Sequence, residues 1–210
     1  MKIKTLISFI IIIFCVTLYG QEEMKTLFGK SSVSPVWGHY LSGDIKITQF
    51  IGDFQPYVGV KGALIVNHKY AFGFTGGGFT EPNTFTGPGY EGSITDIQPV
   101  AAYGGLYLDY FIYLNSPVMI SFPTTVGVGG ILLFQDDINP VLQTSEKRFI
   151  EGTPCFVIEP SINADINLLK SLRLGLGIGY RLVSGVDLNR LDNSDFSGLM
   201  FNISLNAGLF

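Results

Sequence analysis

The chain has 210 residues, of which 47% are hydrophobic and 14% charged, whereas ordinary soluble domains carry about 25% charged residues. This composition argues against an ordinary cytosolic enzyme, and the length suits one domain or one closed barrel. A formal charge of −4 gives nucleic acid no electrostatic attraction. The content of 26 glycines, 17 phenylalanines and 10 tyrosines favours strands and turns.

The first residues have the order of a secretory signal peptide. Lys2 and Lys4 precede an apolar run over 6–16, and polar residues follow Gly20. We therefore expect cleavage after Gly20, which gives a signal peptide at 1–20. An uncleaved anchor helix would need about 20 apolar residues, and the apolar stretch here is shorter. Without the leader, 11 basic residues face 17 acidic ones, a net charge of −6.

Cysteine usage indicates no disulfide. Cys15 lies within the apolar stretch and is expected to leave with the leader, so Cys155 is the one cysteine of the mature chain. A single cysteine cannot form an intramolecular disulfide. A thiol nucleophile would also need a neighbouring histidine, so the expected role of Cys155 is that of a small buried side chain.

Strict alternation of apolar and polar side chains predicts β-strands along most of the mature chain. It is clearest near the C-terminus, where Leu174, Leu176 and Ile178 alternate with Gly175 and Gly177. The same test predicts eight strands. These lie at 40–50, 56–67, 70–79, 97–113, 118–134, 154–168, 172–184 and 197–210.

The connections between these strands alternate in length. The short ones are 67–69, 115–117 and 169–171, and the long polar ones are 80–96, 135–153 and 185–196. Bacterial outer-membrane barrels have short periplasmic turns and longer outer loops. The connection 51–55 is the one short joint expected on the outer side.

A soluble barrel of the lipocalin type is the competing interpretation, with the apolar face inside and the other face in water. The second face carries many glycines, which suit a narrow lumen better than a solvated exterior. They are Gly59, Gly73, Gly77, Gly105, Gly127, Gly129, Gly175, Gly177 and Gly179. The pattern therefore predicts an all-β fold, an eight-stranded antiparallel up-and-down transmembrane β-barrel at 38–210 preceded by a periplasmic lead-in at 21–37.

Aromatic side chains on the apolar face fall near the strand ends. Tyr70 and Tyr110 lie towards the short turns, and Phe156 and Tyr180 lie towards the long loops. We expect them to form the two aromatic girdles at the membrane interfaces.

With these strands, the stretch Gly175–Gly185 and the ending Leu205–Phe210, the chain resembles the small OmpA/OmpX-like outer-membrane barrels, in particular the functionally unassigned type common in Bacteroidetes. The resemblance implies a porin-like envelope protein that contacts outer-membrane lipid and the barrel-assembly machinery. By resemblance Phe210 is the assembly signal. It departs from the usual signal because Leu209, and not Phe210, shares the apolar face.

The polar faces carry four acidic and four basic residues, and this balance predicts ion pairs inside a plugged lumen rather than a selective pore. A hairpin centred on 169–171 places Glu159 opposite Arg181 and Asp165 diagonal to Arg173. The expected lumen charge network consists of Asp44, Lys46, Lys61, Asp109, Glu159, Asp165, Arg173 and Arg181.

The first hairpin of the barrel gives a further expected pair in the lumen. Pairing Ile51 with Phe54 puts Asp44 opposite Lys61. Proton or ion conduction through this network is the alternative to a purely structural role.

The sequence shows no catalytic, cofactor or metal residues. Some eight-stranded outer-membrane barrels act on acyl chains with a histidine and a serine near the outer leaflet. Here His39 is expected before the first strand and His68 in a short turn, both on the periplasmic side. A carboxylate base such as Asp96, Asp136 or Asp137 remains as an alternative. The acidic segment 187–195 lacks the spacing of a calcium loop.

The sequence therefore predicts a monomeric, non-enzymatic outer-membrane barrel, exported through its signal peptide, that acts in envelope structure or in surface binding and adhesion through its outer loops. The sequence also allows an extracellular or periplasmic protein partner. The alternatives are a subunit of a larger envelope secretion or transport complex and, third, a lipid-modifying outer-membrane enzyme.

Overall fold

The computed structural model describes residues 35–80, 84–88, 94–113, 117–139, 144–188 and 191–210. The expected signal peptide and most of the expected lead-in lie outside these residues. The strands are β1 (Trp37–Phe50), β2 (Asp53–Val66), β3 (Tyr70–Phe79), β4 (Phe85–Pro88), β5 (Ile94–Tyr113), β6 (Val118–Ser121), β7 (Thr124–Asn139), β8 (Thr144–Leu169), β9 (Leu172–Ser184) and β10 (Gly198–Leu209), with a short 3-10 helix η2 at Asn193–Phe196.

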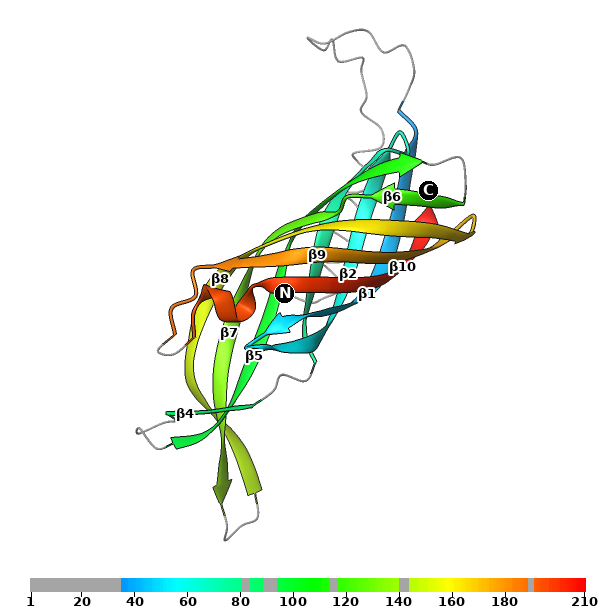
Figure 1. Ribbon diagram of the computed structural model, residues 1–210. Coiled ribbons are helices and arrows are strands. Elements are labelled where there is room, and N and C mark those ends of the chain that lie inside the picture. Colours follow the sequence, from blue (N-terminus) through cyan, green and yellow to red (C-terminus); the bar gives the residue numbers. More distant parts are fainter. Residues whose placement is uncertain (1–34, 81–83, 89–93, 114–116, 140–143, 189–190) are drawn as a thin grey trace, which may run out of the picture. The chain divides into compact units, whose positions relative to one another are not determined.

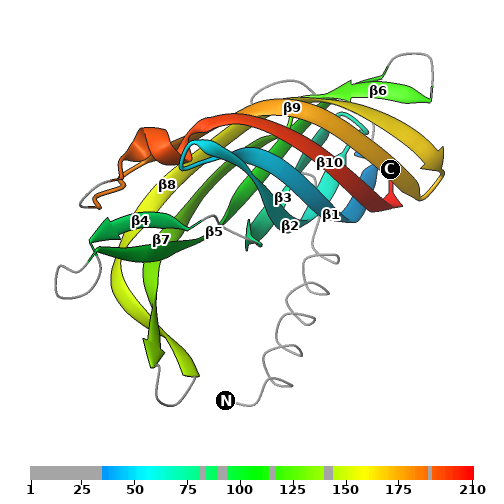
Figure 2. The same cartoon turned by 60° about the horizontal axis from the view of Figure 1, so that its bottom comes forward.

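The strands close into a ring (Figure 1). Each strand pairs antiparallel with its neighbours in the order β1, β2, β3, β5, β7, β8, β9 and β10, and β10 pairs back onto β1. Figure 2 shows β10 lying beside β1 where the ring closes. The predicted eight-stranded antiparallel barrel is confirmed. In the described part of the chain, no helix is long and apolar enough to cross a membrane.

Two short strands are present besides these eight. β6 and β7 occupy one position in the ring, because both pair with β5 and β8 in the same register, and Pro123 separates them. Proline has no N–H to donate to a ladder, so it interrupts the assignment of one continuous strand. β4 pairs with the beginning of β5, at the end of the barrel that carries the long connections.

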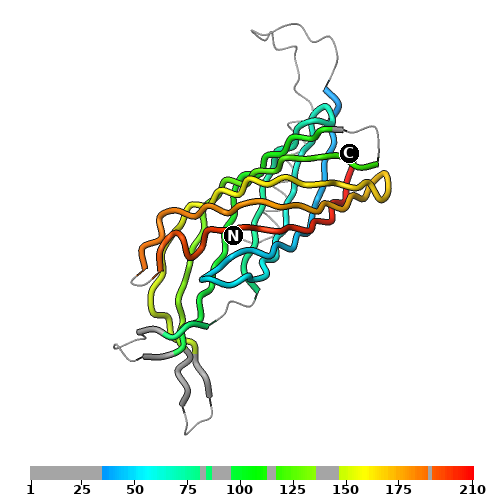
Figure 3. Tube along the Cα trace, viewed as in Figure 1, coloured from blue at the N-terminus to red at the C-terminus, as the bar shows by residue number. Residues whose placement is uncertain are grey.

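The two faces of the barrel wall are inverted relative to those of a water-soluble barrel. Outward side chains are apolar and exposed, as at Leu41 (72%) and Phe74 (71%), whereas inward ones include buried charges such as Asp44 (4%) and Arg181 (1%). An exposed apolar belt that continues around the ring is the surface expected for contact with hydrocarbon. The tilted course of the strands around this belt is visible in the trace of Figure 3.

The first hairpin has a tighter turn than the sequence predicted. Ile51 and Gly52 both have positive φ, 52° and 82°, and β1 therefore pairs Phe50 with Asp53. Two-residue turns with two positive φ values join hairpin strands directly. The predicted pairing of Ile51 with Phe54 was wrong because a β-branched isoleucine seldom adopts this conformation. The Ile51 N–H donates to the Asp195 carbonyl at 2.6 Å, and this hydrogen bond connects the turn to η2.

Correcting this turn shifts the register of β1 against β2 by two residues. Asp44 lies opposite Gly59, and Lys61 lies opposite Ser42. The expected directly opposed pair of Asp44 and Lys61 is therefore a diagonal one.

The long-loop end holds more strand than the sequence predicted. β7 and β8 continue as a hairpin to Asn139 and Thr144, through most of the expected loop 135–153, with a register shift between Leu133 and Phe134. At the opposite end, called here the tight-turn end, the Gly208 N–H of β10 donates to the Ser171 carbonyl at 2.9 Å. The C-terminus lies at that end (Figure 1).

Candidate functional site

All eight residues of the expected charge network point into the lumen. Seven of them are at most 7% exposed, and the side chain of Lys61 is 10% exposed. Their positions follow from the two-residue period of the strands, which puts every second side chain inside. Buried charges need partners, so the contacts of each group decide what the lumen can do.

Glu159 on β8 is the centre of the network. Its carboxylate accepts hydrogen bonds from Arg181 Nε at 2.7 Å and from Lys46 Nζ at 2.6 Å. The hydroxyl of Tyr103 donates to the same carboxylate at 2.5 Å and accepts from an Arg181 terminal nitrogen at 2.8 Å. The register that predicted Arg181 opposite Glu159 is present, since Ile158 pairs with Leu182. Three donors on one carboxylate make this a strongly bonded anion.

An aromatic stack supports the same cations. The rings of Tyr57 and Tyr103 stack with centroids 4.8 Å apart. Lys46 Nζ lies 5.0 Å from the Tyr57 centroid, and Arg181 Cζ lies 5.0 Å from the Tyr103 centroid. Such contacts stabilise buried cations through the ring quadrupole. Sequence reasoning considered only the charges and missed both tyrosines, although Tyr103 shares the parity of Asp109 on the inward face of β5.

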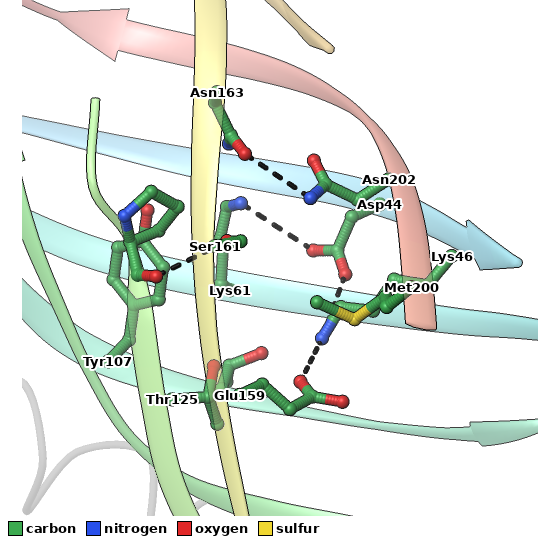
Figure 4. Close-up of a pocket in the computed structure, with 12 residues that line it drawn as sticks. Asp44, Lys46, Lys61, Tyr107, Thr125, Glu159, Ser161, Asn163, Met200 and Asn202 are labelled. Carbon is green, nitrogen blue, oxygen red and sulfur yellow. Dashed lines mark hydrogen bonds and ion pairs between the residues drawn. The ribbon is translucent and has the colours of Figure 1, made fainter. Parts of the chain in front are cut away.

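Asp44 connects this centre to Lys61. Its carboxylate lies 4.0 Å from Lys46 Nζ and 3.9 Å from Lys61 Nζ, as the dashed lines of Figure 4 show. The ammonium of Lys61 also lies 5.0 Å from the ring centroid of Tyr107. The central cluster therefore joins five charges, Asp44, Lys46, Lys61, Glu159 and Arg181.

The other three residues of the expected network bind polar neighbours. Asp165 accepts from Ser121 Oγ at 2.5 Å, and Asp109 accepts from the Tyr107 hydroxyl at 2.7 Å. Arg173 lies diagonal to Asp165, as the register predicted, but its Nε donates to Asn167 Oδ1 at 2.9 Å.

Phe210 turns inward at the tight-turn end. The guanidinium carbon of Arg173 lies 3.9 Å from its ring centroid, and the ring of Tyr40 lies 5.8 Å away. This agrees with the register, which put Phe210 on the face opposite to the lipid-facing Leu209.

Two apolar clusters cover the charged layer. The cluster at the long-loop end, called here the outer cap, includes Phe50, Tyr57, Leu188, Leu191 and Phe196. The cluster at the tight-turn end, called here the inner cap, consists of Tyr40, Ala63, Ile65, Ala71, Tyr107, Phe111 and Met119, with Phe210 packed against it. Charged groups thus lie between two apolar seals.

Little space remains between the two caps. A cavity of about 20 Å³ lies beside Asp44 and Glu159, and another of about 10 Å³ lies beside Asp109 and Arg173. One water molecule needs roughly 10–15 Å³. Each of these two cavities therefore has room for about one water molecule, and side chains fill the lumen around them.

Inward glycines make room for this filling. At Gly77 a Cβ atom would lie 2.7 Å from the Tyr57 hydroxyl and would also meet the main chain of β2. Any side chain there would displace the ring that stacks on Tyr103. The glycine-rich inner face predicted from the sequence is thus a steric condition for the aromatic stack.

The histidines lie far from the long-loop end. His39 is exposed within β1, not before it as predicted, and His68 is exposed in the turn between β2 and β3. Of the carboxylates considered as alternative bases, Asp96 accepts from Thr86 Oγ1 at 3.2 Å. The side chains of Asp136 and Asp137 lie outside the described residues.

Asp192 in the acidic segment caps η2. Its carboxylate accepts from the Ser194 hydroxyl at 2.6 Å and from the Ser194 N–H at 2.7 Å. These bonds, the hydroxyl bond first, hold the pKa of Asp192 below its ordinary value. The side chain has a local structural role as an N-cap.

Comparisons with known proteins relate the chain to others by fold. No protein-family model matches the sequence, and no curated protein matches it. Among solved structures, Neisserial surface protein A is similar with a TM-score of 0.52 and 8% identity, over 83% of this chain and 99% of that one.

Two further solved structures are similar. The N-terminal β-barrel domain of Pseudomonas aeruginosa OprF has a TM-score of 0.45 and 7% identity, over 82% of this chain and 97% of that one. Ail, the attachment invasion locus protein of Yersinia pestis, has a TM-score of 0.44 and 13% identity, over 82% and 96%. The chain has the fold of the small eight-stranded outer-membrane β-barrels, whose outer face contacts lipid.

Proposed function

We propose that this protein is an exported, monomeric outer-membrane barrel that acts through its long-loop end, by binding or adhesion at the cell surface, and not through its lumen. In this proposal residues 1–20 are a cleaved signal peptide, 21–37 a periplasmic lead-in and 38–210 the barrel. The barrel performs no catalysis, and Phe210 is its assembly signal. The observation that carries the proposal is the lumen, where a cluster of five charges is covered by an apolar cap at each end.

Because the lumen is sealed, a binding surface must lie on the parts of the chain that project from the barrel. The β7–β8 hairpin extends beyond the ring and carries exposed aromatic surface, because Phe149 is 52% exposed and its ring packs edge-on against Phe134 at 5.9 Å. Lys147 Nζ donates to Gln98 Oε1 at 2.5 Å, which joins the hairpin to β5. A braced hairpin with exposed aromatic side chains is a surface suited to protein binding.

The test compares cells that display the whole protein with cells that display a variant whose hairpin, residues 134–150, is replaced by Asn-Gly, which removes both phenylalanines and joins the paired residues Leu133 and Glu151. The probes are attachment to a surface coated with extracellular-matrix proteins and aggregation between cells. We expect the variant to keep the heat-dependent gel shift of a closed barrel and to lose attachment and aggregation. Unchanged behaviour in both assays would contradict a role of the hairpin in binding.

Two alternatives give different results in parallel measurements. A subunit of a larger secretion or transport complex copurifies with fixed partners in mild detergent. A lipid-modifying enzyme changes the masses of envelope lipids when the gene is deleted. Under the proposed function, envelope lipid masses stay the same and the barrel purifies alone.

A further inference from the structure

The charges of this protein are divided unequally between the two ends of the barrel. The lumen network holds four acids and four bases, which cancel. By sequence, eleven acidic and three basic residues lie in the connections and strand extensions of the long-loop end, which are 51–55, 80–96, 135–153 and 185–196. The connections of the tight-turn end, 67–69, 114–117 and 169–171, hold Lys69 and Lys170 and no aspartate or glutamate. The barrel is therefore electrically polar along its axis.

From this division and the geometry around the two lysines, we propose that the tight-turn end binds the phosphate groups of anionic phospholipids through Lys69 and Lys170. The proposal rests on the membrane location proposed above and goes beyond it, because it names the lipid class that the barrel selects and the residues that select it. These two lysines and the aromatic side chains beside them are called here the basic rim.

The main chain holds Lys69 at a fixed place on the rim. It follows the turn residues Asn67 and His68, whose φ values are 53° and 57°. The Lys69 N–H donates to the Val66 carbonyl at 3.1 Å, and the Lys69 carbonyl accepts from the Phe111 N–H at 2.8 Å. The β2–β3 turn is therefore bonded to β5, and only the exposed lysine side chain is left to reach outward.

Aromatic side chains mark the level of the lipid headgroups beside Lys69. Tyr70, the next residue, is 56% exposed, and its ring lies 5.3 Å from that of Tyr110. The Tyr110 ring lies 6.5 Å from that of Phe122. Exposed tyrosines concentrate where a membrane protein crosses from hydrocarbon to headgroups. An ammonium on a flexible stem at this level reaches lipid phosphates while the stem covers apolar surface.

Lys170 has an equivalent setting in the β8–β9 turn. The residues before it, Leu168 and Leu169, are 49% and 64% exposed. The Ser171 carbonyl after it accepts from the Gly208 N–H at 2.9 Å, which fixes the turn against β10. Both lysines thus adjoin outward apolar residues that contact hydrocarbon in a membrane.

The spacing of the two lysines favours lipids over an acidic protein. Lys69 joins β2 to β3 and Lys170 joins β8 to β9, with β1 and β10 between these hairpins in the ring. Two cations spread around the edge of a barrel can each meet a separate headgroup of the surrounding leaflet. A protein epitope concentrates its contacts at a central patch.

The experiment uses the full chain refolded into detergent micelles and titrated with phosphatidylglycerol or phosphatidylcholine. Native mass spectrometry measures the lipid retained. We expect the wild type to retain phosphatidylglycerol preferentially and the double variant K69Q/K170Q to lose this preference, by about fivefold for each lysine. Salt at high concentration should weaken the preference because it screens exposed charges.

Two control variants separate this site from charge in general. Lys147→Gln removes an exposed lysine at the long-loop end and should keep the wild-type preference. The double variant K69R/K170R keeps the positive charge and should also keep the preference for phosphatidylglycerol. A K69Q/K170Q protein that shows the heat-dependent gel shift and still prefers phosphatidylglycerol overturns the proposal. A wild type that never shows that shift in lipid vesicles instead overturns the membrane location on which the proposal rests.

Discussion

Single side chains in the lumen gain their importance from their number of partners. Glu159 is 2% exposed and accepts hydrogen bonds from Arg181, Lys46 and Tyr103. If Glu159 loses one of these partners, bulk water cannot replace the lost hydrogen bond, because both caps exclude water from the charged layer. Removing a partner therefore lowers the free energy of unfolding by more than the loss of an exposed ion pair would.

Arg181→Ala should lower the free energy of unfolding by about 3–5 kcal/mol, because it removes one of two cations that bind Glu159 and leaves buried charge uncompensated. The measurement is urea unfolding in lipid vesicles, followed by the fluorescence of Trp37, the only tryptophan. Tyr103→Phe is the matched variant. It keeps the aromatic ring and loses only the hydroxyl bonds, so we expect a loss of about 1–2 kcal/mol. An unchanged midpoint in Arg181→Ala would exclude a stabilising role for the pair.

At the scale of elements, the turns separate what the sequence could predict from what it could not. The two-residue period located β3 and β9 at the bounds found in the structure, because one face of each meets hydrocarbon and the other meets the lumen. The β1–β2 register was wrong because no residue type signals a positive φ at Ile51. The β7–β8 extension was missed because alternation weakens once a hairpin leaves the membrane.

The β2–β3 turn depends on Asn67, whose φ is 53° and whose Oδ1 accepts from the Val36 N–H at 3.1 Å. Asn67→Ala should destabilise the barrel by about 1–2 kcal/mol, because it adds strain in the left-handed region and removes the hydrogen bond. Asn67→Gly relieves the strain and loses only the bond, so its unfolding midpoint in urea should fall between those of wild type and Asn67→Ala. Equal midpoints for the alanine and glycine variants would contradict the expected backbone strain of alanine at position 67.

The η2 cap gives a pH dependence outside the membrane. Since the pKa of Asp192 is below its ordinary value of 3.8, the cap contributes stability above the unfolded pKa and loses it as the pH falls through the lower folded pKa. Hydrogen exchange of the Ser194 amide should thus stay protected down to pH 3.8 and increase below it. Asp192→Asn keeps an N-cap without a titrating group, so its protection should not change over this range. Loss of protection above pH 5 in the wild type would contradict the assignment.

For the whole molecule, the sequence predicted which residues enter the lumen but not how the lumen closes. Parity along each strand identifies inward positions, and the eight charged residues selected by parity have buried or nearly buried side chains. The caps combine residues distant in the chain, as when the ring of Phe196 meets that of Phe50 at 5.1 Å in the outer cap. Such contacts depend on loop conformation and on ring closure, which no local pattern contains. We expect the two caps and the filled charged layer between them to act as barriers in series, so that opening the caps alone does not open the lumen.

Planar-bilayer conductance tests this arrangement directly. The outer-cap variant Phe50→Ala and the inner-cap variant Phe111→Ala each remove one buried ring, 2% and 3% exposed. Either single variant should remain closed like the wild type, because the other cap still excludes water from the charged layer. The double variant F50A/F111A should also stay closed, because the charged side chains between the caps leave cavities of only about 20 Å³ and 10 Å³. The heat-dependent gel shift must first show that each variant forms a closed barrel. Discrete conductance steps in the double variant or in either single variant would mean that the caps alone are the barrier, and the arrangement in series would be wrong.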